Sequence, residues 1–459
     1  MIKRSLQLMS NTAYKFVPSP QASHFGPSVW VEFSPLSIKH KSINLGQGFP
    51  DFEPPQFVSD ALAKTVETGG FNQYARSPGH LRLVNAISKV YSPYFERTIE
   101  PTTEVVTTVG ASEAIFCAIQ TCVGQGDEVI LIEPFFDIYS GAVVMAGGVS
   151  KHVPLREQPR KNVTDARSSA NWELDWDEFE KAFTPKTRVL LLNNPHNPVG
   201  KVWSRAELER IAEIVKRHPQ VTVISDEVYE WMTYDGIKHE RFATIKDMYD
   251  RTITVGSAGK TFSITGWKIG WCIGPKNIIS AIANVHQYIP FSVHTPSQEA
   301  VAIALEETLH RDYLKELAQM YQGKRDRLVT SLRQAGLDPV VPQGTYFVLG
   351  DTSRIHLQGD EGQSSSITGM GKHLRDWNVC RWLTTDIGVT AIPISAFYSE
   401  EHAHLPANYA RFCFCKKDQV LDQADKAFQQ IKNTKNFNII TLLYNHYHLC
   451  IFLHTLSLF

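Results

Sequence analysis

Short apolar segments alternate with amphipathic stretches through the middle of the chain. Between two of the apolar segments, residues 204–218 carry apolar side chains at helical spacing and begin with a capping box, in which Ser204 precedes Glu207 by three positions. The alternation predicts an α/β fold with a large, mostly parallel central sheet flanked by helices. The expected strands, most of them rich in Val, Ile or Leu, cover residues 104–109, 128–132, 188–192, 221–225 and 252–255.

The pattern changes after about residue 320. A helical stretch at 321–336 is followed by strand-like segments near 344–351 and 388–398, which is typical of a smaller α+β domain. A chain of 459 residues is also too long for one ordinary core, since single cores stop growing at roughly 250–300 residues. We therefore expect two domains with a cleft between them.

The two ends of the chain differ in composition from the rest. Residues 1–31 contain no Asp or Glu but do contain Lys, Arg, Ser and Thr, which is typical of a mitochondrial transit peptide; a short flexible arm that lies over a partner subunit is the alternative. Residues 436–459 carry no charge, but Asn, His and Thr interrupt the run. An extra buried segment, or an extension foreign to the catalytic fold, is therefore favoured there over a membrane anchor.

The overall composition narrows the class of protein. A net charge of -1, 43% hydrophobic and 20% charged residues indicate an ordinary globular enzyme rather than a disordered or nucleic-acid-binding chain. The seven cysteines form no CxxC pair, so neither a metal site nor a disulfide framework is expected, which indicates a reducing compartment. We expect a protein of the cytoplasm or the mitochondrion.

Three polar side chains follow three of the expected strands: Asn197, Asp226 and Lys260. Because the carboxyl ends of parallel strands meet at one edge of a sheet, these side chains should face one crevice. A strand-terminal Asp alone is more often a turn or a helix cap, so only the ordered set indicates a site. An amide, a carboxylate and an amine are what pyridoxal 5'-phosphate (PLP) requires, for its phenolic oxygen, its pyridinium nitrogen and its aldehyde carbon respectively.

A phosphate site is expected beside this crevice. Gly110, Ala111 and Ser112 lead from the first expected strand into a helical stretch, whose N-terminus offers N–H groups to an anion. Ser257 and Lys268 would complete the phosphate shell through a hydroxyl group and a charge.

The lysine of the segment GSAGKT has two interpretations. As the lysine that bonds PLP, Lys260 must lose its proton, and burial or a nearby cation such as Lys268 would lower its pKa. The segment could also be the phosphate loop of an NTPase, but Thr254 stands where that motif requires glycine, so this interpretation fails.

Seven segments follow one another along the chain: NLGQGFPDF, EPFFDIY, NNPHNPVGK, SDEVYEWMTYDG, GSAGKTFSITGWKIGW, GTYFVLGD and RFCFCKKD. Together they resemble the class I aminotransferases of PLP fold type I, over about residues 30–430. The LGQGFPDF and GSAGKTFSITGWK segments look most like the kynurenine aminotransferases, also called cysteine-S-conjugate β-lyases or glutamine transaminases K; similar bacterial enzymes prefer methionine. We assign residues 61–320 to the large PLP-binding domain, 29–60 with 321–435 to the small domain, 1–28 to an arm or transit segment and 436–459 to an extension.

The resemblance implies a role for each residue of the cofactor site. Lys260 is then the catalytic Schiff-base lysine and Asp226 the partner of the pyridinium nitrogen. The other implied contacts are Asn197 and Tyr229 to the phenolic oxygen, Phe136 stacked on the ring, Ala111, Ser112, Ser257 and Lys268 to the phosphate, and Tyr74 to the phosphate of a neighbouring subunit. Core packing is the alternative for Tyr74 and Phe136.

The substrate side follows from the same resemblance. Arg411 would hold the α-carboxylate of the substrate through two parallel hydrogen bonds, with Asn197, Gly48 and Trp30 around the substrate; an internal salt bridge is the alternative for Arg411. Ser112 and Ser292 stand where some animal relatives have tyrosine and histidine. Both differences concern the pocket for the substrate side chain, so the sequence predicts the reaction type better than the substrate.

The expected activity is transfer of an amino group from L-kynurenine, or from aromatic and sulfur-containing amino acids, to a 2-oxo acid such as 2-oxoglutarate. Kynurenic acid is then the product, with cysteine-S-conjugate β-lyase as a side activity. The enzyme alternative is a methionine, glutamine or general aromatic aminotransferase. An alternative of another class is a PLP-fold binding protein without catalysis. A homodimer with shared sites is expected, and neither a nucleic acid nor a membrane partner.

Overall fold

An eight-stranded mixed sheet forms the centre of the larger part of the molecule. The computed structural model describes residues 16–160, 162, 165–357 and 374–434. Each of the five segments expected to be strands lies in this sheet, so the predicted α/β class is confirmed. In spatial order the strands are β2 (Val105–Val109), β9 (Ile269–Ile273), β8 (Thr252–Ser257), β7 (Thr222–Asp226), β6 (Thr187–Asn193), β3 (Glu128–Glu133), β4 (Val149–Glu157) and β5 (Trp172–Leu174).

The strand directions decide which side chains meet. Strands β4, β3, β6, β7 and β8 are parallel, whereas β9 is antiparallel to both of its neighbours, β8 and β2. Because β9 runs opposite to both β8 and β2, these two strands run in the same direction. The carboxyl end of β2 therefore lies at the same edge of the sheet as that of β8. The predicted crevice at this edge is therefore supplied by four strand ends.

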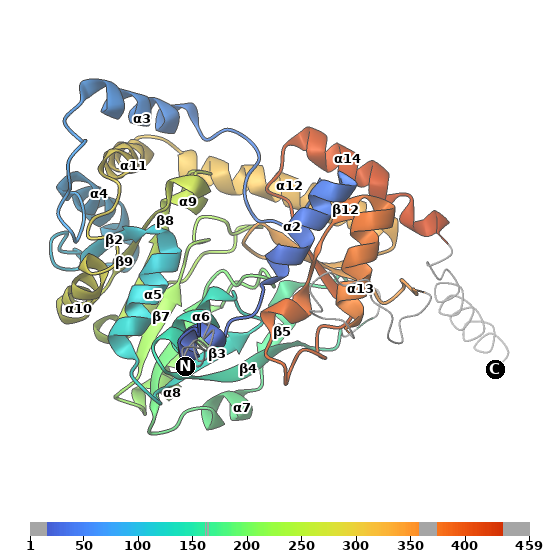
Figure 1. Cartoon of the computed structure of the whole chain (residues 1–459), viewed down its shortest axis with the longest axis horizontal. Helices are drawn as coiled ribbons and strands as arrows, with labels where there is room; N and C mark the ends of the chain where they lie inside the picture. The colour runs from blue at the N-terminus through green and yellow to red at the C-terminus, as the bar shows by residue number, and fades with distance from the viewer. Residues whose placement is uncertain (1–15, 161, 163–164, 358–373, 435–459) are drawn as a thin grey trace, which may run out of the picture.

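Helices cover the sheet on both sides (Figure 1), as an α/β chain with buried parallel strands requires. The predicted capping box is present at the start of α8, where the Ser204 side chain accepts from the Glu207 N–H and the Glu207 side chain from the Ser204 N–H. The helices are α1 (Pro20–Ser23), α2 (Val29–His40), α3 (Gln56–Thr68), α4 (Leu81–Tyr91), α5 (Gly110–Cys122), α6 (Ile138–Met145), α7 (Trp176–Lys181), α8 (Arg205–Lys216), α9 (Ala258–Thr261), α10 (Lys276–Gln287), α11 (Thr295–Thr308), α12 (Tyr313–Ala335), α13 (Arg375–Trp382) and α14 (Asp418–Phe428).

A second, smaller body is built around a four-stranded antiparallel sheet. The strand order is β10 (Asp338–Val340), β11 (Phe347–Asp351), β14 (Tyr409–Cys413) and β13 (Ile392–Pro393). Beside it β1 (Ile43–Asn44) pairs in parallel with β12 (Val389–Thr390), and Figure 1 shows α2 on the same side of the molecule as α13 and α14. This pairing supports the proposed grouping of 29–60 with 321–435.

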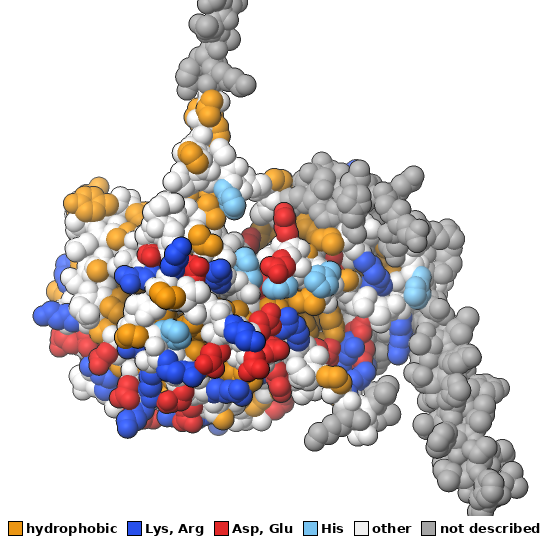
Figure 2. Space-filling model, turned by 90° about the horizontal axis from the view of Figure 1, so that it is seen from below, with side chains coloured by type: hydrophobic (Ala, Val, Ile, Leu, Met, Phe, Trp, Pro, Cys, Tyr) orange, Lys and Arg blue, Asp and Glu red, His pale blue; other side chains and the backbone are white. Residues whose placement is uncertain are grey.

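The proposed domain boundaries fall inside helices. Residue 61 lies within α3, which packs on α11 of the larger body, and residue 320 lies within α12. Residues 16–28 are exposed and contain the single turn α1, whereas the interpretations of residues 1–15 and 436–459 lie outside the described residues. In the described part of the chain, no helix has the length and apolar character needed to cross a membrane. Figure 2 shows basic and acidic side chains interspersed over one face.

Candidate active site

A cavity of about 340 Å³ opens at the carboxyl edge of the large sheet, against the small body. Tyr74 is the one predicted site residue that does not line it: its side chain is 81% exposed and lies 5.2 Å from the ring of Phe291, so core packing is not its role here. Ser292 is likewise absent from the lining. The structure brings together the other predicted residues, Trp30, Gly48, Ala111, Ser112, Phe136, Asn197, Asp226, Tyr229, Ser257, Lys260, Lys268 and Arg411.

Lys260 is half-buried and presents its amine to the cavity. It follows β8 in the short helix α9, and its Nζ donates to the hydroxyl of Tyr346 at 2.7 Å. Burial is the main cause that lowers the pKa of Lys260 to about 8; the charges of Arg411 and Lys268 act in the same direction, and those of Cys415 and Asp226 act against it. The amine can therefore lose its proton near neutral pH, as a nucleophile or proton carrier must.

Asp226 ends β7 and offers a carboxylate to the same cavity. Its Oδ2 accepts from the hydroxyl of Tyr139 at 2.5 Å, and its Oδ1 accepts from the Val228 N–H at 3.3 Å. Burial raises the pKa of Asp226 to about 6, against the opposing effects of these two bonds and of the Lys260 charge. A ring nitrogen that carries a proton would supply the buried carboxylate with a cationic partner.

The turn from β2 into α5 has the form of an anion site. Gly110 has a φ of +70°, and a Cβ placed there would stand 3.2 Å from the Nζ of Lys268. A Cβ on Gly270 would lie 2.5 Å from the Ala111 nitrogen, so this turn packs directly on β9. The Lys268 ammonium lies beside the N-terminus of α5, whose partial charge is also positive. Within the described residues no carboxylate pairs with Lys268 there to offset the two positive charges. Such an arrangement fits a bound phosphate.

Arg411 lies on β14 and lines the same cavity as this turn. Its guanidinium donates to the Gly46 carbonyl at 2.8 Å and to Asn197 Oδ1 at 3.3 Å. The ring of Phe347 lies 4.1 Å from it, and burial lowers its pKa. Among the described residues no carboxylate lies within salt-bridge distance of Arg411, so the internal ion pair considered above is not seen, and its buried Nε has no hydrogen-bond partner. A carboxylate ligand would satisfy this group.

Sequence reasoning missed three residues of the site. Tyr139 donates to Asp226. Tyr346 accepts from Lys260 and donates to the Gly48 carbonyl at 2.6 Å. The ring of Phe347 covers the Arg411 guanidinium. Each belongs to a segment already singled out, EPFFDIY or GTYFVLGD. Their position in segments that carry the family resemblance was the only available signal, because an aromatic side chain in an apolar segment is usually part of the core.

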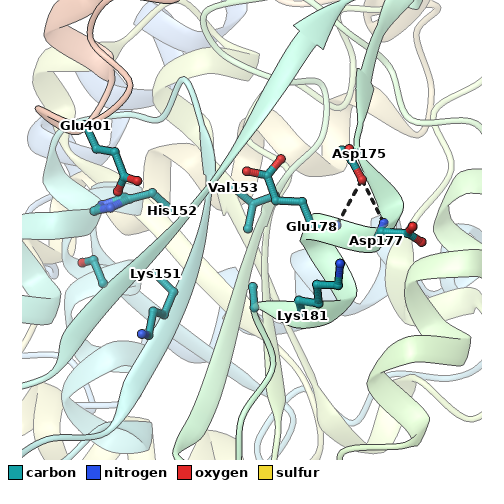
Figure 3. A pocket seen from close by; sticks show the side chains of 10 residues that line it. Lys151, His152, Val153, Asp175, Asp177, Glu178, Lys181 and Glu401 are labelled. Atoms are coloured by element: carbon teal, nitrogen blue, oxygen red, sulfur yellow. Dashed lines mark hydrogen bonds between the residues drawn. The ribbon is translucent and has the colours of Figure 1, made fainter.

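A wider hollow, of about 720 Å³, lies between β4 and α7 (Figure 3). Two of its acidic side chains already have structural roles: Asp175 caps α7 by accepting from the N–H groups of Asp177 and Glu178, and Glu178 also pairs with Arg156. It contains no counterpart of the buried amine or the carboxylate-free guanidinium. The smaller cavity is therefore the better candidate.

Comparisons with known proteins agree with this geometry. The family model of class I and II aminotransferases matches residues 40–428. The chain is 63% identical, over 91% of its length and 97% of the relative, to a kynurenine–oxoglutarate transaminase of Dictyostelium discoideum. It is 41% identical to kynurenine–oxoglutarate transaminase 3 of Homo sapiens, over 90% of each chain.

Solved structures have the same fold. The structure of Bna3p from Saccharomyces cerevisiae superposes with a TM-score of 0.86 at 34% identity, covering 92% of this chain and all of that one. YbdL from Escherichia coli, for which a methionine aminotransferase function has been identified, gives a TM-score of 0.80 at 34% identity, covering 91% of this chain and all of that one. The predicted fold type is thus confirmed, and the chain belongs to the family of class I and II aminotransferases.

Proposed function

We propose that this chain is a PLP-dependent transaminase that moves the amino group of L-kynurenine to a 2-oxo acid such as 2-oxoglutarate. One observation carries the proposal: a single cavity presents both the amine of Lys260 and the guanidinium of Arg411, which has no carboxylate within salt-bridge distance among the described residues. Amino acids and 2-oxo acids both carry the α-carboxylate that such a guanidinium would bind. The activity named for the 63% identical relative supports kynurenine as the amino donor.

When bound, PLP supplies a ring that withdraws the electron pair left behind when a proton leaves the substrate α-carbon. The residues proposed to hold PLP are those listed above: Asp226 for the ring nitrogen, Asn197 and Tyr229 for the phenolic oxygen, and Phe136 for the ring face. The turn at Ala111 and Ser112, together with Ser257 and Lys268, would hold the phosphate. All of these residues line the one cavity, which supports the assignment; Tyr74, expected at the phosphate of a neighbouring subunit, does not line it.

The protein's own groups would then move the proton. Arg411 holds the α-carboxylate of the substrate and so fixes the α-carbon relative to Lys260. Lys260, whose pKa burial lowers to about 8, takes the α-proton as a base and returns it as an acid. Tyr346 donates to the Gly48 carbonyl and accepts from Lys260, and it would hold the amine in place between these two steps.

Aromatic side chains around Arg411 favour an aromatic or sulfur-containing substrate. Trp30 lies 5.6 Å and Phe347 lies 4.1 Å from the guanidinium carbon, and Gly48 leaves room beside Phe347, where a Cβ would overlap the ring. A substrate with a good leaving group on its β-carbon would lose it from the same deprotonated state. That loss would give cysteine-S-conjugate β-lyase as a side activity.

We propose a homodimer with shared sites, in the cytoplasm or the mitochondrion. The side chains of Tyr74 and Tyr288 are 81% and 86% exposed, and Ile289 and Phe291 next to them are also exposed. An apolar surface of this kind is expected to be covered by a partner. Light scattering after size exclusion would test the proposal, and a fully active monomer would refute it.

Two alternatives remain, one with an observation in its favour and one with an observation against it. The similarity to YbdL favours a methionine aminotransferase, and glutamine or general aromatic amino acids belong to the same enzyme alternative. A binding protein without catalysis is the alternative of another class; the presence of Lys260, Asp226 and Arg411 in one cavity counts against it.

The test is turnover of PLP-loaded protein with L-kynurenine and a panel of 2-oxo acids, followed as kynurenic acid. Lys260→Ala is the control, and product formed only by the unmutated protein supports the proposal. If methionine or glutamine bleaches the cofactor absorption while kynurenine gives no product, the kynurenine assignment is wrong and the transaminase remains. Cofactor absorption that no amino acid changes would favour the binding protein.

A further inference from the structure

Glu113 closes the turn that lines the candidate phosphate site. Its Oε2 accepts from the backbone N–H of Val109 at 2.5 Å, and its Oε1 accepts from Nδ1 of His286 at 2.7 Å. Val109 is the last residue of β2 and Glu113 lies in the first turn of α5, so the carboxylate spans Gly110 to Ser112. The same residues present the free N–H groups of a helix N-terminus to the cavity.

The carboxylate creates an electrostatic conflict at this place. A helix N-terminus attracts anions, and here Glu113 and a bound phosphate would share the same first turn. The Glu113 side chain is only 10% exposed, so water screens the repulsion between the two anions weakly. The thiol of Cys117, 3.5 Å from Oε1, offers no countercharge. A partner must offset the carboxylate if the phosphate is to bind well.

His286 is placed to be that partner. It is fully buried, and it reaches Glu113 from α10, which packs on α5. Among the described residues nothing hydrogen-bonds to its second nitrogen, Nε2, although that nitrogen is buried as well. An orphaned buried nitrogen is unfavourable, so an apolar side chain would fill the space better. The hydrogen bond from Nδ1 to Glu113 is therefore the interaction that explains a histidine at this position.

We propose that His286 is a positioning residue for the cofactor phosphate: through Glu113 it holds the Val109–Ser112 turn in the phosphate-binding conformation and offsets the carboxylate beside the phosphate. The inference rests on the proposed use of PLP. It extends that proposal to two residues that do not line the cavity and that would touch neither cofactor nor substrate.

The test compares ligands with and without a phosphate, on the full-length protein freed of cofactor. Dissociation constants for PLP, pyridoxal and inorganic phosphate are measured by tryptophan fluorescence, with chromophore absorption as a second signal. His286→Leu removes the donor, and the matched variant His286→Asn keeps an N–H group near Nδ1. His286→Leu should weaken PLP and phosphate about tenfold or more, as loss of a hydrogen bond to a charged group would, and leave pyridoxal unchanged. His286→Asn should stay near the unmutated protein.

A second substitution removes the conflict itself. In the double variant His286→Leu with Glu113→Gln, the neutral amide still accepts from Val109 and no longer repels phosphate, so most of the PLP affinity should return. If His286→Leu fails to fold, Glu113→Gln and Glu113→Ala replace it: the first should keep PLP affinity and the second should lose it, with pyridoxal unaffected in both.

Three results would overturn the inference. The first is an unchanged dissociation constant for PLP in His286→Leu. The second is an equal loss of affinity for PLP and pyridoxal in that variant, which indicates a purely structural role. The third is equal PLP affinity in Glu113→Gln and Glu113→Ala. Unmutated protein that fails to bind PLP would refute the proposed function too. Normal PLP binding by the unmutated protein with any of those three results refutes this inference alone.

Discussion

Replacing Arg411 with methionine should separate activity from stability. The guanidinium is 2% exposed and has no carboxylate partner among the described residues, so in the free protein it is a buried charge held only by the Gly46 carbonyl, Asn197 and aromatic rings. Two charge-assisted hydrogen bonds to a substrate carboxylate contribute about 1.5–3 kcal/mol each. Their loss should lower kcat/KM by roughly 10²–10⁴ for both the amino acid and the 2-oxo acid.

The free energy of unfolding should change little. Methionine resembles the arginine stem in shape and removes a desolvated charge, so Arg411→Met should cost the folded state no more than about 1 kcal/mol. Arg381→Met is the matched control, because Arg381 is also buried but pairs with Glu32, with Nε 2.5 Å from Oε1. Leaving Glu32 without that partner should cost about 3–5 kcal/mol.

Two assays decide the matter: kcat/KM for each substrate, and denaturant unfolding of the cofactor-free protein. The reasoning is refuted if Arg411→Met unfolds as easily as Arg381→Met, since the guanidinium would then be a structural group. It is equally refuted if kcat/KM for either substrate stays within about threefold of the unmutated protein, because one lost charged hydrogen bond alone exceeds that change.

Three further predictions concern groups around the cavity. The rate at which cofactor-free protein captures PLP, followed by absorption, should rise through about pH 8, because burial lowers the pKa of Lys260 to about 8 and only the neutral amine attacks; a midpoint at the ordinary lysine value would contradict this. Tyr139→Phe removes a bond that lowers the pKa of Asp226, so that pKa should rise above about 6 and the acidic limb of kcat/KM should move to higher pH; an unmoved limb would show that Tyr139 does not tune Asp226. Gly48→Ala would drive a Cβ into the Phe347 ring, and we expect a loss of about 1–3 kcal/mol in unfolding free energy together with reduced activity; a variant that melts and turns over like the unmutated protein would disprove the close contact.

Much of the site could be predicted because the sequence indicates the direction of the strands. Once the apolar segments indicate parallel strands, Asn197, Asp226 and Lys260 must meet at one edge, and the cavity contains all three. The reversal of β9 was not expected, yet it leaves the end of β2, with Gly110, at that same edge. The order of polar residues after strands is thus a stronger signal than any one of them.

The site residues and the boundary that the sequence did not predict depend on contacts between distant parts of the chain. Tyr346 reaches Lys260 from a residue 86 positions away, and Tyr139 reaches Asp226 from 87 positions away. Nothing in the local pattern distinguishes these hydroxyl groups from those of packed core tyrosines. The boundary expected at residue 61 falls within α3 for a similar reason, since α3 is held to the larger body by packing on α11, which lies far along the chain.

The hydrogen bond from Arg411 to the Gly46 carbonyl joins residues 365 positions apart, and β1 pairs with a strand that is made nearly as late. During synthesis on a ribosome, the whole eight-stranded sheet, residues 105–273, leaves the exit tunnel well before Arg411 is added. Lys260 and the turn at Gly110 can therefore be in place before Arg411 is added to the chain. A chain interrupted late would contain the residues proposed to bind PLP but would lack the arginine proposed to bind the substrate carboxylate.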